Sequence, residues 1–290
     1  MNSRMRLRIC TRKSRLSLRQ TQLAVDALRA AYPELEVELH PFQTRGDVIL
    51  DRPLWELSGS GKGVFSSEFE QLLLRDEIDL AVHSGKDLPL ALAEGLEIVG
   101  VLRRADPRDV LILPQGRRVE DCRSIGTGSL RRQQSAAEIF PWAQCRLIRG
   151  NIHTRLQKLE GGEYDAIVLA KAGLDRMGIT ERDGYRFRVL SPEEFLPAAC
   201  QGMIVLEGRK ELADFVGKIS HAETMQLFET ERAVLTLLNA DCSEPVAAFA
   251  ERQDGRIRLR ASYGKRYAEG IAPAAERLEL AADVVRRLKG

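Results

Sequence analysis

The spacing of apolar residues predicts alternating strands and helices over the first hundred positions. Short apolar or alternating runs at 6–10, 36–40 and 79–83 are typical of strands. Residues 65–75 repeat apolar positions at helical spacing, and a helix opened by Thr11 or Ser14 is expected to run to about Ala31. The apolar residues expected near one face of that first helix are Leu16, Leu23, Ala27, Leu28 and Ala31. This alternation predicts an α/β unit.

A second stretch repeats the same plan. Residues 124–126 are strand-like, a helix is expected over 130–140, and further strands are expected at 145–148 and 164–170 with a helix from about Thr154 between them. The paired segments are Arg19-Gln20 with Arg132-Gln133, and Arg45-Gly46-Asp47 with Arg149-Gly150-Asn151. We therefore expect two α/β domains of similar build, although chance likeness between α/β units is an alternative for part of the repeat.

A third stretch begins near His221 and reads as a small α+β module. A helix is expected over 225–238, then a turn with Cys242, strands at 246–250 and 256–263, and a terminal helix from about Pro273. Linkers are expected near 103–107 and 191–202. The chain would pass from the first domain to the second through one linker and return through the other, so the two crossings would form a hinge. Ligands favour the cleft between such domains. The expected domains are 1–104 with 200–219, 105–199 and 220–290.

The charge balance excludes a protein dominated by a uniform basic field. The 290 residues include 44 Lys plus Arg against 42 Asp plus Glu, so the net charge is +2, and 44% of residues are hydrophobic. A general nucleic-acid binder would carry a much larger net positive charge, and a disordered chain would contain a smaller fraction of hydrophobic residues. Of the basic residues 35 are Arg and nine are Lys. Arg binds carboxylates and phosphates in bidentate fashion, although GC-rich codon usage is an alternative cause of the excess.

The sequence does not indicate a secreted, membrane-spanning or metal-binding protein. The basic N-terminus has no apolar segment after it, so no secretory signal is expected, and no run of 18 apolar residues predicts a membrane span. The five cysteines are scattered without a C-x-x-C pair, which is typical of reduced thiols in a cytoplasmic protein. The four His are equally dispersed, so no metal site is expected.

Basic and hydroxyl residues recur where predicted strands give way to helices. Helix N-termini hold anions well because their N–H groups are free and the helix dipole is positive there. Two such domains would place several anion-binding sites along one cleft. The alternative for each residue is that the hydroxyl groups only cap helices and the arginines are only exposed to solvent. The candidates are Arg12, Ser14, Lys62, Thr127, Ser129, Arg131, Arg132, Arg149 and Arg155.

Nucleotide-binding motifs are not matched. The glycine-rich segment 58–63 contains Lys62, but Glu56 and Gly63 stand where a P-loop needs Gly and Ser or Thr. Gly126-x-Gly128 lacks the third glycine of a dinucleotide fingerprint, because Arg131 occupies that place. Carboxylates therefore fit the arginines as well as phosphates do.

Asp87 and Cys242 are the candidates for reactive chemistry. Asp87 follows Lys86 just past an apolar strand, where it would stay ionised and stabilise a cation or shuttle a proton, with a helix cap as the alternative. Cys242 lies in a polar turn and is a candidate nucleophile or attachment point. The other four cysteines lie in or beside apolar segments, as small packed hydrophobes do.

Seven short motifs follow one another along the chain. They are Leu7-Arg8-Ile9-Cys10-Thr11-Arg12-Lys13-Ser14, Thr44-Arg45-Gly46-Asp47, Gly61-Lys62-Gly63-Val64-Phe65, Ala81-Val82-His83-Ser84-Gly85-Lys86-Asp87-Leu88-Pro89, Gly126-Thr127-Gly128-Ser129-Leu130-Arg131-Arg132-Gln133, Arg149-Gly150-Asn151 with Thr154-Arg155-Leu156, and Ala199-Cys200-Gln201-Gly202. Together they resemble the porphobilinogen deaminase, or hydroxymethylbilane synthase, family, and the set is specific because all seven occur in order. The match extends from about Arg6 to the Cys242 turn and more weakly beyond it.

The resemblance implies a fold and a reaction. The fold would be α/β, with two similar periplasmic-binding-protein-like domains around a cleft plus a small C-terminal α+β domain. The reaction would be the stepwise head-to-tail condensation of four porphobilinogen molecules, with release of ammonia, on a covalent dipyrromethane primer. It would be an enzyme of tetrapyrrole and heme biosynthesis, a transferase (EC 2.5.1.61), working as a cytoplasmic monomer with no nucleic-acid, membrane or metal partner.

The resemblance also assigns residues. Cys242 would hold the dipyrromethane by a thioether and Asp87 would be catalytic, stabilising the azafulvene cation left when ammonia departs. Cofactor binding would involve Asp87, Lys86, Thr127, Ser129, Arg131 and Arg132, and substrate binding Arg12, Ser14, Lys62, Arg149, Arg155 and Arg176. Each added ring brings an acetate and a propionate, so the growing product needs preplaced cations.

Several positions depart from the family pattern. Gly85 replaces a usual Met, Ser67 a usual Lys and Gly128 a usual Ser, while Asp241 and Glu244 flank the cysteine. The two acids are expected to raise the thiol pKa and to repel acidic rings. These departures leave a non-catalytic or divergent anion-binding protein on the same scaffold as the alternative.

Overall fold

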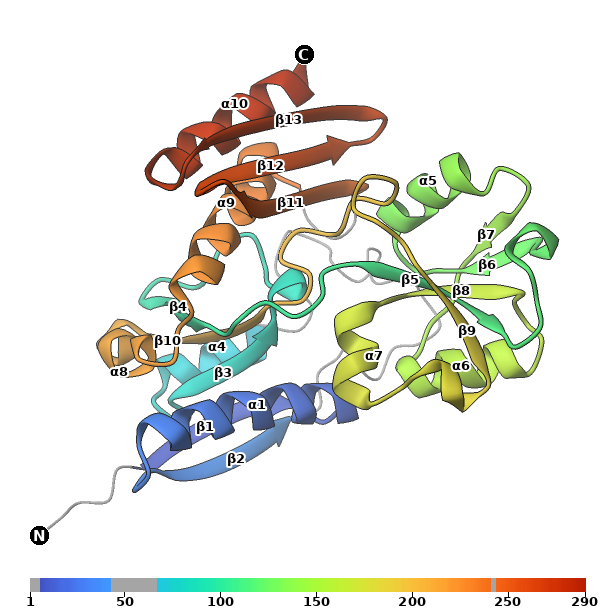
Figure 1. Cartoon of the computed structure of the whole chain (residues 1–290). Coiled ribbons are helices and arrows are strands. Elements are labelled where there is room, and N and C mark those ends of the chain that lie inside the picture. Colours follow the sequence, from blue (N-terminus) through green and yellow to red (C-terminus); the bar gives the residue numbers. More distant parts are fainter. Residues whose placement is uncertain (1–5, 43–66, 241–243) are drawn as a thin grey trace, which may run out of the picture.

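The computed structural model describes residues 6–42, 67–240 and 244–290. Figure 1 shows three parts, each built on one β-sheet: an N-terminal part at the lower left, a second part at the right and a C-terminal part at the top. Two of the sheets have five strands and the third has three. The expectation of two α/β units followed by a small α+β module is confirmed.

The first sheet combines strands from both sides of the second one in the sequence. Its strands in spatial order are β2 (Glu36–Phe42), β1 (Arg6–Arg12), β3 (Leu80–Ser84), β10 (Ile204–Arg209) and β4 (Leu96–Val101). Strands β2, β1 and β3 are parallel, whereas β10 is antiparallel to both of its neighbours. The chain thus leaves this sheet after β4 and returns to its interior with β10.

Helices cover both faces of the first sheet. On one face α1 (Arg15–Ala31) and α8 (Ala213–Gly217) bury apolar side chains such as Leu28 and Val216. On the other face α4 (Ser67–Leu74) packs Phe69 and Leu73 against the sheet. The predicted apolar face of α1 was wrong in part, since Leu23 is 42% exposed. The residues that α1 buries are Gln20, Thr21, Ala24, Val25 and Leu28.

The second sheet has the same topology as the first. Its strands in spatial order are β7 (Gln144–Arg146), β6 (Ser124–Gly126), β8 (Ala166–Ala170), β5 (Asp109–Pro114) and β9 (Tyr185–Val189). Strands β7, β6 and β8 are parallel and β5 is antiparallel to its neighbours. The repeat inferred from sequence is therefore a repeat of strand order and direction.

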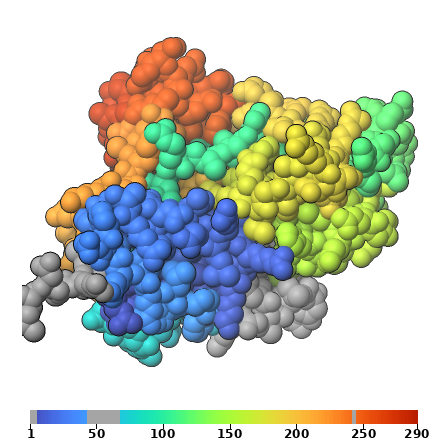
Figure 2. All heavy atoms as spheres, turned by 60° about the horizontal axis from the view of Figure 1, so that its bottom comes forward, coloured from blue at the N-terminus to red at the C-terminus, as the bar shows by residue number. Residues whose placement is uncertain are grey.

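Helices also cover both faces of the second sheet. Helix α5 (Leu130–Ile139) packs Ala136 in one apolar cluster, and α6 (Ile152–Glu160) with α7 (Lys171–Met177) packs in the other. Helix α7 also contacts α1 of the first part. Figure 2, which brings the bottom of the molecule forward, shows the blue N-terminal and yellow second parts meeting side by side.

The third part is an antiparallel sheet covered by two helices. Strands β11 (Val246–Gln253), β12 (Arg256–Tyr263) and β13 (Arg266–Pro273) pair in sequence order, and α9 (Ala222–Leu238) and α10 (Arg277–Lys289) pack on them. Strand β13 was not predicted from sequence. Five short 3-10 helices complete the described elements: η1 (Gly85–Asp87), η2 (Val119–Asp121), η3 (Glu181–Asp183), η4 (Lys210–Leu212) and η5 (Ala274–Glu276).

The two crossings between the five-stranded sheets are bonded to each other. Ala105 N donates to Gly202 O at 3.1 Å, and Leu102 N donates to Ile204 O at 3.0 Å. Gly202 has a φ of +88°, and a Cβ there would lie 2.6 Å from the Ala105 carbonyl oxygen. Only glycine fits this close approach in the left-handed region, so Gly202 allows the crossings to touch.

Candidate functional site

The candidate residues of both halves follow the carboxyl ends of parallel strands. Strand β3 leads into η1 with Lys86 and Asp87, and β6 leads into the N-terminus of α5 with Arg131 and Arg132. Strand β7 is followed by the turn that carries Arg149 and by α6. This is the edge where open α/β sheets bind ligands.

Electrostatic contact joins the two halves at this edge. Lys86 and Asp87 of the first part interact with Arg132 and Arg155 of the second. Arg155 also lies within electrostatic range of Arg149. The structure therefore brings six predicted residues together: Lys86, Asp87, Arg131, Arg132, Arg149 and Arg155. We refer to these six as the cleft cluster.

Asp87 is the exposed carboxylate of the cleft cluster. It is the last residue of η1, and its side chain is open to solvent, whereas its neighbours Gly85 and Leu88 are buried. The charges in its electrostatic surroundings include Lys86 and Arg155. An exposed carboxylate between cations is suited to hold N–H donors or a developing positive charge.

Lys86 has an ammonium group whose charge is easily lost. Burial and repulsion from Arg132 lower its pKa to about 8, with Asp87 and Asp109 partly opposing the shift. Its Nζ donates to Gln201 Oε1 at 3.4 Å. Lys86 is therefore a cation at neutral pH that gains stability from any anion placed beside it.

Asp109 is a buried counter-ion for two predicted ligands. The carboxylate is fully buried and pairs with Arg131 Nη2 at 2.8 Å and with Arg132 Nη2 at 2.7 Å. Burial disfavours its charge, but the two arginines outweigh burial and hold its pKa well below the usual range. Asp109 was not predicted from the sequence as a site residue. A carboxylate that opens the wholly apolar run Val110–Leu113 is a signal that a buried cation must lie nearby.

Gln201 connects Asp109 to Lys86 across the hinge. Its Nε2 donates to Asp109 Oδ1 at 3.0 Å and to Pro107 O at 2.7 Å, while its Oε1 accepts from Lys86. The side chain is 1% exposed. Gln201 belongs to a motif that carried the family resemblance, but its position between the two crossings was not predictable from spacing.

Arg131 and Arg132 each keep one buried donor without a partner. Their Nη1 atoms donate to Leu196 O at 2.8 Å and to Val168 O at 3.0 Å, respectively. The Nε atoms of both are buried and make no hydrogen bond in the described structure. Two buried, unpaired cationic donors fit an anionic group, so the residues present suit a dipyrromethane with its acetate and propionate groups.

Arg149 and Arg155 line the same edge from the start of α6. Burial lowers the pKa of both, and for Arg155 repulsion from Arg132 and Arg149 adds to the shift, giving about 10. Arg155 Nε donates to Gly150 O at 2.8 Å, which fixes the side chain against its own turn. Both remain charged at neutral pH, as arginines in proteins do.

The predicted hydroxyl residues act as caps in this structure. Ser14 accepts from Ser17 N at 3.1 Å, and Ser129 accepts from Arg132 N at 3.5 Å. Thr127, which is fully buried, accepts from Ser129 N at 3.3 Å. These bonds show the capping role that was the alternative for each residue, and the N-terminus of α5 carries Arg131 and Arg132 of the cleft cluster.

Arg12 and Arg176 are the remaining predicted arginines in the described residues. Arg12 ends β1, immediately before the α1 cap. Arg176 Nη2 donates to Gly202 O at 2.6 Å, so this side chain bonds to the hinge, and burial lowers its pKa to about 10. Lys62, Ser67 as a side chain, Asp241 and Cys242 fall outside the described residues.

The four described cysteines are unsuited to nucleophilic chemistry. Burial raises the pKa of Cys10 to about 12 and that of Cys122 to about 11, and it also raises the pKa of Cys145 and Cys200. They are therefore protonated thiols at neutral pH, and the thiolate is the reactive form. This confirms the expectation that they pack as small hydrophobes.

Glu231 ties the third part to both hinge crossings. This buried carboxylate pairs with Arg104 Nη1 at 2.6 Å and accepts from Cys200 N at 2.5 Å. It also accepts from Ala250 N of β11 at 2.7 Å. The third part is thus bonded to the same two segments that join the sheets.

Two departures from the family pattern have a structural account. A Cβ on Gly85 would lie 3.0 Å from Cys200 Cβ and 3.2 Å from Val205 Cγ2, so the second crossing leaves no room for a larger side chain. Glu244 forms a hydrogen bond with Tyr263 of β12, which raises the tyrosine pKa. The expected effect of Asp241 and Glu244 on the cysteine stays a prediction.

The described residues offer neither a metal site nor a membrane-spanning helix. No group of three or more His, Cys, Asp or Glu in residues 6–42, 67–240 and 244–290 could hold a metal ion. None of the helices described is long and apolar enough to cross a membrane.

Comparisons with known proteins agree with one another over most of the chain. Residues 7–216 match the family model described as "Porphobilinogen deaminase, dipyromethane cofactor binding domain". A porphobilinogen deaminase of Alkaliphilus oremlandii (strain OhILAs) is 41% identical over 261 residues, covering 89% of this chain and 86% of that protein. One from Ruminiclostridium josui is 42% identical over 259 residues, covering 89% and 87%.

A solved structure adds a more distant likeness. The periplasmic aliphatic sulphonate-binding protein of Escherichia coli is 14% identical, with a TM-score of 0.43, over 82% of this chain and 71% of that one.

Proposed function

The chain belongs to the porphobilinogen deaminase family, and on that premise we propose that it is a hydroxymethylbilane synthase. It condenses four porphobilinogen molecules head to tail, releases one ammonia at each step and yields the linear tetrapyrrole hydroxymethylbilane. This is a reaction of tetrapyrrole and heme biosynthesis, and we assign it to the transferases (EC 2.5.1.61). The observation that carries the proposal is the cleft cluster, which joins five cations to the exposed carboxylate of Asp87 through the electrostatic contacts of Lys86 and Arg155.

The family's cofactor is a dipyrromethane, which supplies a covalently held primer whose free end accepts each new ring. We propose that Arg131, Arg132 and Lys86 hold its carboxylates, and that the N-terminus of α5, with Thr127 and Ser129, contributes N–H groups. Two arginines with buried, unpaired Nε donors support this assignment. An anion would also stabilise the charged form of Lys86, which burial disfavours.

We propose Asp87 as the catalytic residue. Departure of ammonia from porphobilinogen leaves a cation, and a carboxylate that is exposed between fixed cations would stabilise that charge and orient the pyrrole N–H. Arg149 and Arg155, which lie within electrostatic range of each other, would bind the acetate and propionate of the incoming ring. Arg12, Ser14, Lys62 and Arg176 are proposed for further rings on the basis of the family resemblance.

We propose Cys242 as the attachment point of the cofactor. The raised pKa of each of the four described cysteines supports this choice, because a thioether requires a reachable thiolate. Glu244 is bonded to Tyr263, so at least one of the two neighbouring acids is engaged elsewhere. The proposed domains are 1–104 with 200–219, 105–199 and 220–290, in a protein that works as a cytoplasmic monomer.

Asp87→Asn tests the proposal, with Asp76→Asn as a control on a carboxylate outside the cleft cluster. We expect Asp87→Asn to keep the cofactor mass and to lose at least 99% of turnover, measured as ammonia released per enzyme molecule per unit time. Asp76→Asn should keep normal turnover. Near-normal rates in Asp87→Asn would remove Asp87 from the mechanism, and absence of turnover in the wild-type protein would favour the non-catalytic alternative.

A further inference from the structure

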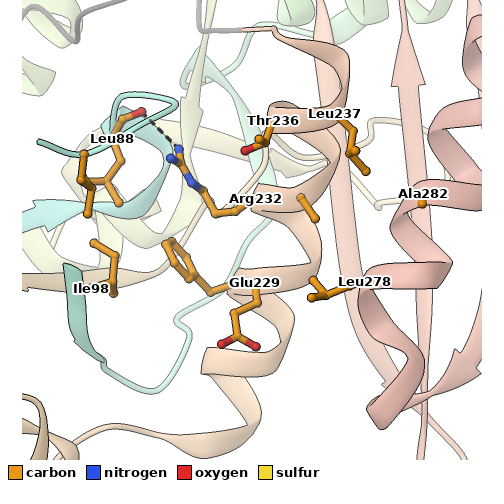
Figure 3. Close-up of a pocket in the computed structure, with 11 residues that line it drawn as sticks. Leu88, Ile98, Glu229, Arg232, Thr236, Leu237, Leu278 and Ala282 are labelled. Atoms are coloured by element: carbon orange, nitrogen blue, oxygen red, sulfur yellow. Dashed lines mark hydrogen bonds between the residues drawn. The ribbon is translucent and has the colours of Figure 1, made fainter. Parts of the chain in front are cut away.

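A pocket of about 480 Å³ lies between the first and third parts, and none of its lining residues belongs to the cleft cluster. Figure 3 shows it between the segment after η1, strand β4, and helices α9 and α10. Its apolar lining comprises Leu88, Leu92, Ile98, Phe228, Ala233, Leu237, Leu278 and Ala282. Binding pockets for small molecules have this size and this mostly apolar lining, with a few polar groups that fix orientation.

The polar groups of the pocket are Glu229, Arg232 and Thr236. Glu229 already has a cationic partner, since its Oε2 accepts from Arg277 Nε at 2.7 Å. The pocket therefore offers one side chain whose charge is not matched by a carboxylate.

That side chain is Arg232. Within the parts of the chain that the structure describes, Arg232 forms no ion pair, and its guanidinium instead donates to main-chain carbonyls. The acceptors are Leu88 O at 3.4 Å, Pro89 O and Leu90 O at 2.9 Å. Burial lowers the pKa of Arg232, so the charge is held where solvent stabilises it poorly. A carboxylate is the group that such a guanidinium binds best.

We propose that this pocket is a regulatory site for an amphipathic monocarboxylate, a ligand with an aromatic or aliphatic body and one carboxylate. The apolar body would lie against Phe228, Leu237 and Leu278, and the carboxylate would bind the guanidinium of Arg232. Charge complementarity selects this class, because a neutral apolar ligand would leave Arg232 without a counter-ion and a cation would be repelled.

The position of Arg232 connects this pocket to the proposed active site. The carbonyls that it holds belong to the three residues after Asp87, so a ligand that draws Arg232 away releases the segment that anchors η1. Glu231, the next residue along α9, bonds to both hinge crossings. Ligand binding thereby lowers turnover through Asp87 and the hinge rather than through substrate binding.

Calorimetric titration of the cofactor-loaded protein with 4-phenylbutyrate tests the binding. We expect saturable binding that is at least about tenfold weaker for the neutral 4-phenylbutyramide, because the charge-assisted bond to Arg232 is lost. Ala282→Phe, which fills the pocket from an exposed helical position, should weaken binding by a similar factor. Ala30→Phe, a matched change on the exposed face of α1, should leave it unchanged.

Kinetics separate this site from the cleft cluster. In the wild-type protein the acid should lower kcat and leave KM unchanged. In Ala282→Phe it should change neither kcat nor KM. A rise in KM that persists in Ala282→Phe would place the acid among the cleft arginines and overturn the proposal. Equal binding of acid and amide would also overturn it, and binding without a fall in kcat would overturn the coupling to Asp87. The calorimetric titration does not require the proposed activity, so a protein without that activity could still bind the acid, and the two outcomes are distinguishable.

Discussion

Asp109→Asn removes the single buried carboxylate that holds Arg131 and Arg132 together. The wild-type carboxylate is fully buried and makes contacts of 2.8 and 2.7 Å to the two guanidiniums, which are 5% and 6% exposed. The variant leaves two buried cations next to each other without a counter-charge. Breaking a buried ion pair by removing one partner costs about 3–5 kcal/mol, and we expect a loss of unfolding free energy in that range.

Urea unfolding at pH 7, followed by circular dichroism, measures this loss. Asp106→Asn is the matched control, because Asp106 lies three residues before Asp109 and pairs with Arg108, but the side chains of that pair are 22% and 43% exposed. We expect the control to lose no more than about 1 kcal/mol, as partly exposed pairs do. Equal stability losses in the two variants would refute the reasoning.

The pH dependence of the same difference provides a second check. Since the pKa of Asp109 is depressed in the folded protein, its contribution is present above the unfolded value of about 3.9 and is lost as pH falls below it. The stability gap between wild type and Asp109→Asn should therefore be constant from pH 7 to about 5 and shrink at lower pH. A gap that widens on acidification would contradict the assignment of Asp109 as the ionised partner.

Two further predictions concern the first part of the protein. Because the pKa of Lys86 is about 8, its charge and its hold on the cofactor's carboxylates decrease as pH rises through 8. Turnover should therefore fall there in the wild type and not in Lys86→Arg, and identical pH profiles of turnover would exclude this role for Lys86. Gly85→Ala should lower the free energy of unfolding in urea by about 1–3 kcal/mol, since the new Cβ would lie 3.0 Å from Cys200 Cβ. Gly217→Ala is the control and should not lower it, because no atom lies within 4 Å of the Cβ position there. Equal effects of the two changes would contradict the packing argument.

The local parts of the fold were predictable because they depend on neighbouring residues. Ser14 and Ser129 begin their helices by capping backbone N–H groups three residues on, and Pro33 follows the end of α1. The repeated order of strand, turn and helix was visible for the same reason. The buried face of α1 was less predictable, since apolar residues such as Leu18 and Leu23 stay exposed while Gln20 and Thr21 are buried.

Features that depend on distant residues were not predictable from one sequence. The pairing of Asp109 with Arg131 and Arg132 joins residues 22 and 23 positions apart, and Gln201 joins it from 92 positions away. Strand β13 was missed because its apolar residues stand in adjacent pairs without a period of two and Gly270 interrupts the run, and its stability comes from pairing with β12. Arg176 was assigned to substrate by resemblance, whereas the structure bonds it to the hinge carbonyl of Gly202.

The central claim is that the chain carries a covalent dipyrromethane on Cys242, and the mass of the intact, purified protein tests it most directly. The account predicts the polypeptide mass plus two pyrrole rings for the wild type, and the bare polypeptide mass for Cys242→Ser. Cys200→Ser serves as the control and should keep the added rings, because the Cys200 thiol is buried and its pKa is raised. A bare polypeptide mass for the wild type, or retention of the rings in Cys242→Ser, would contradict the account.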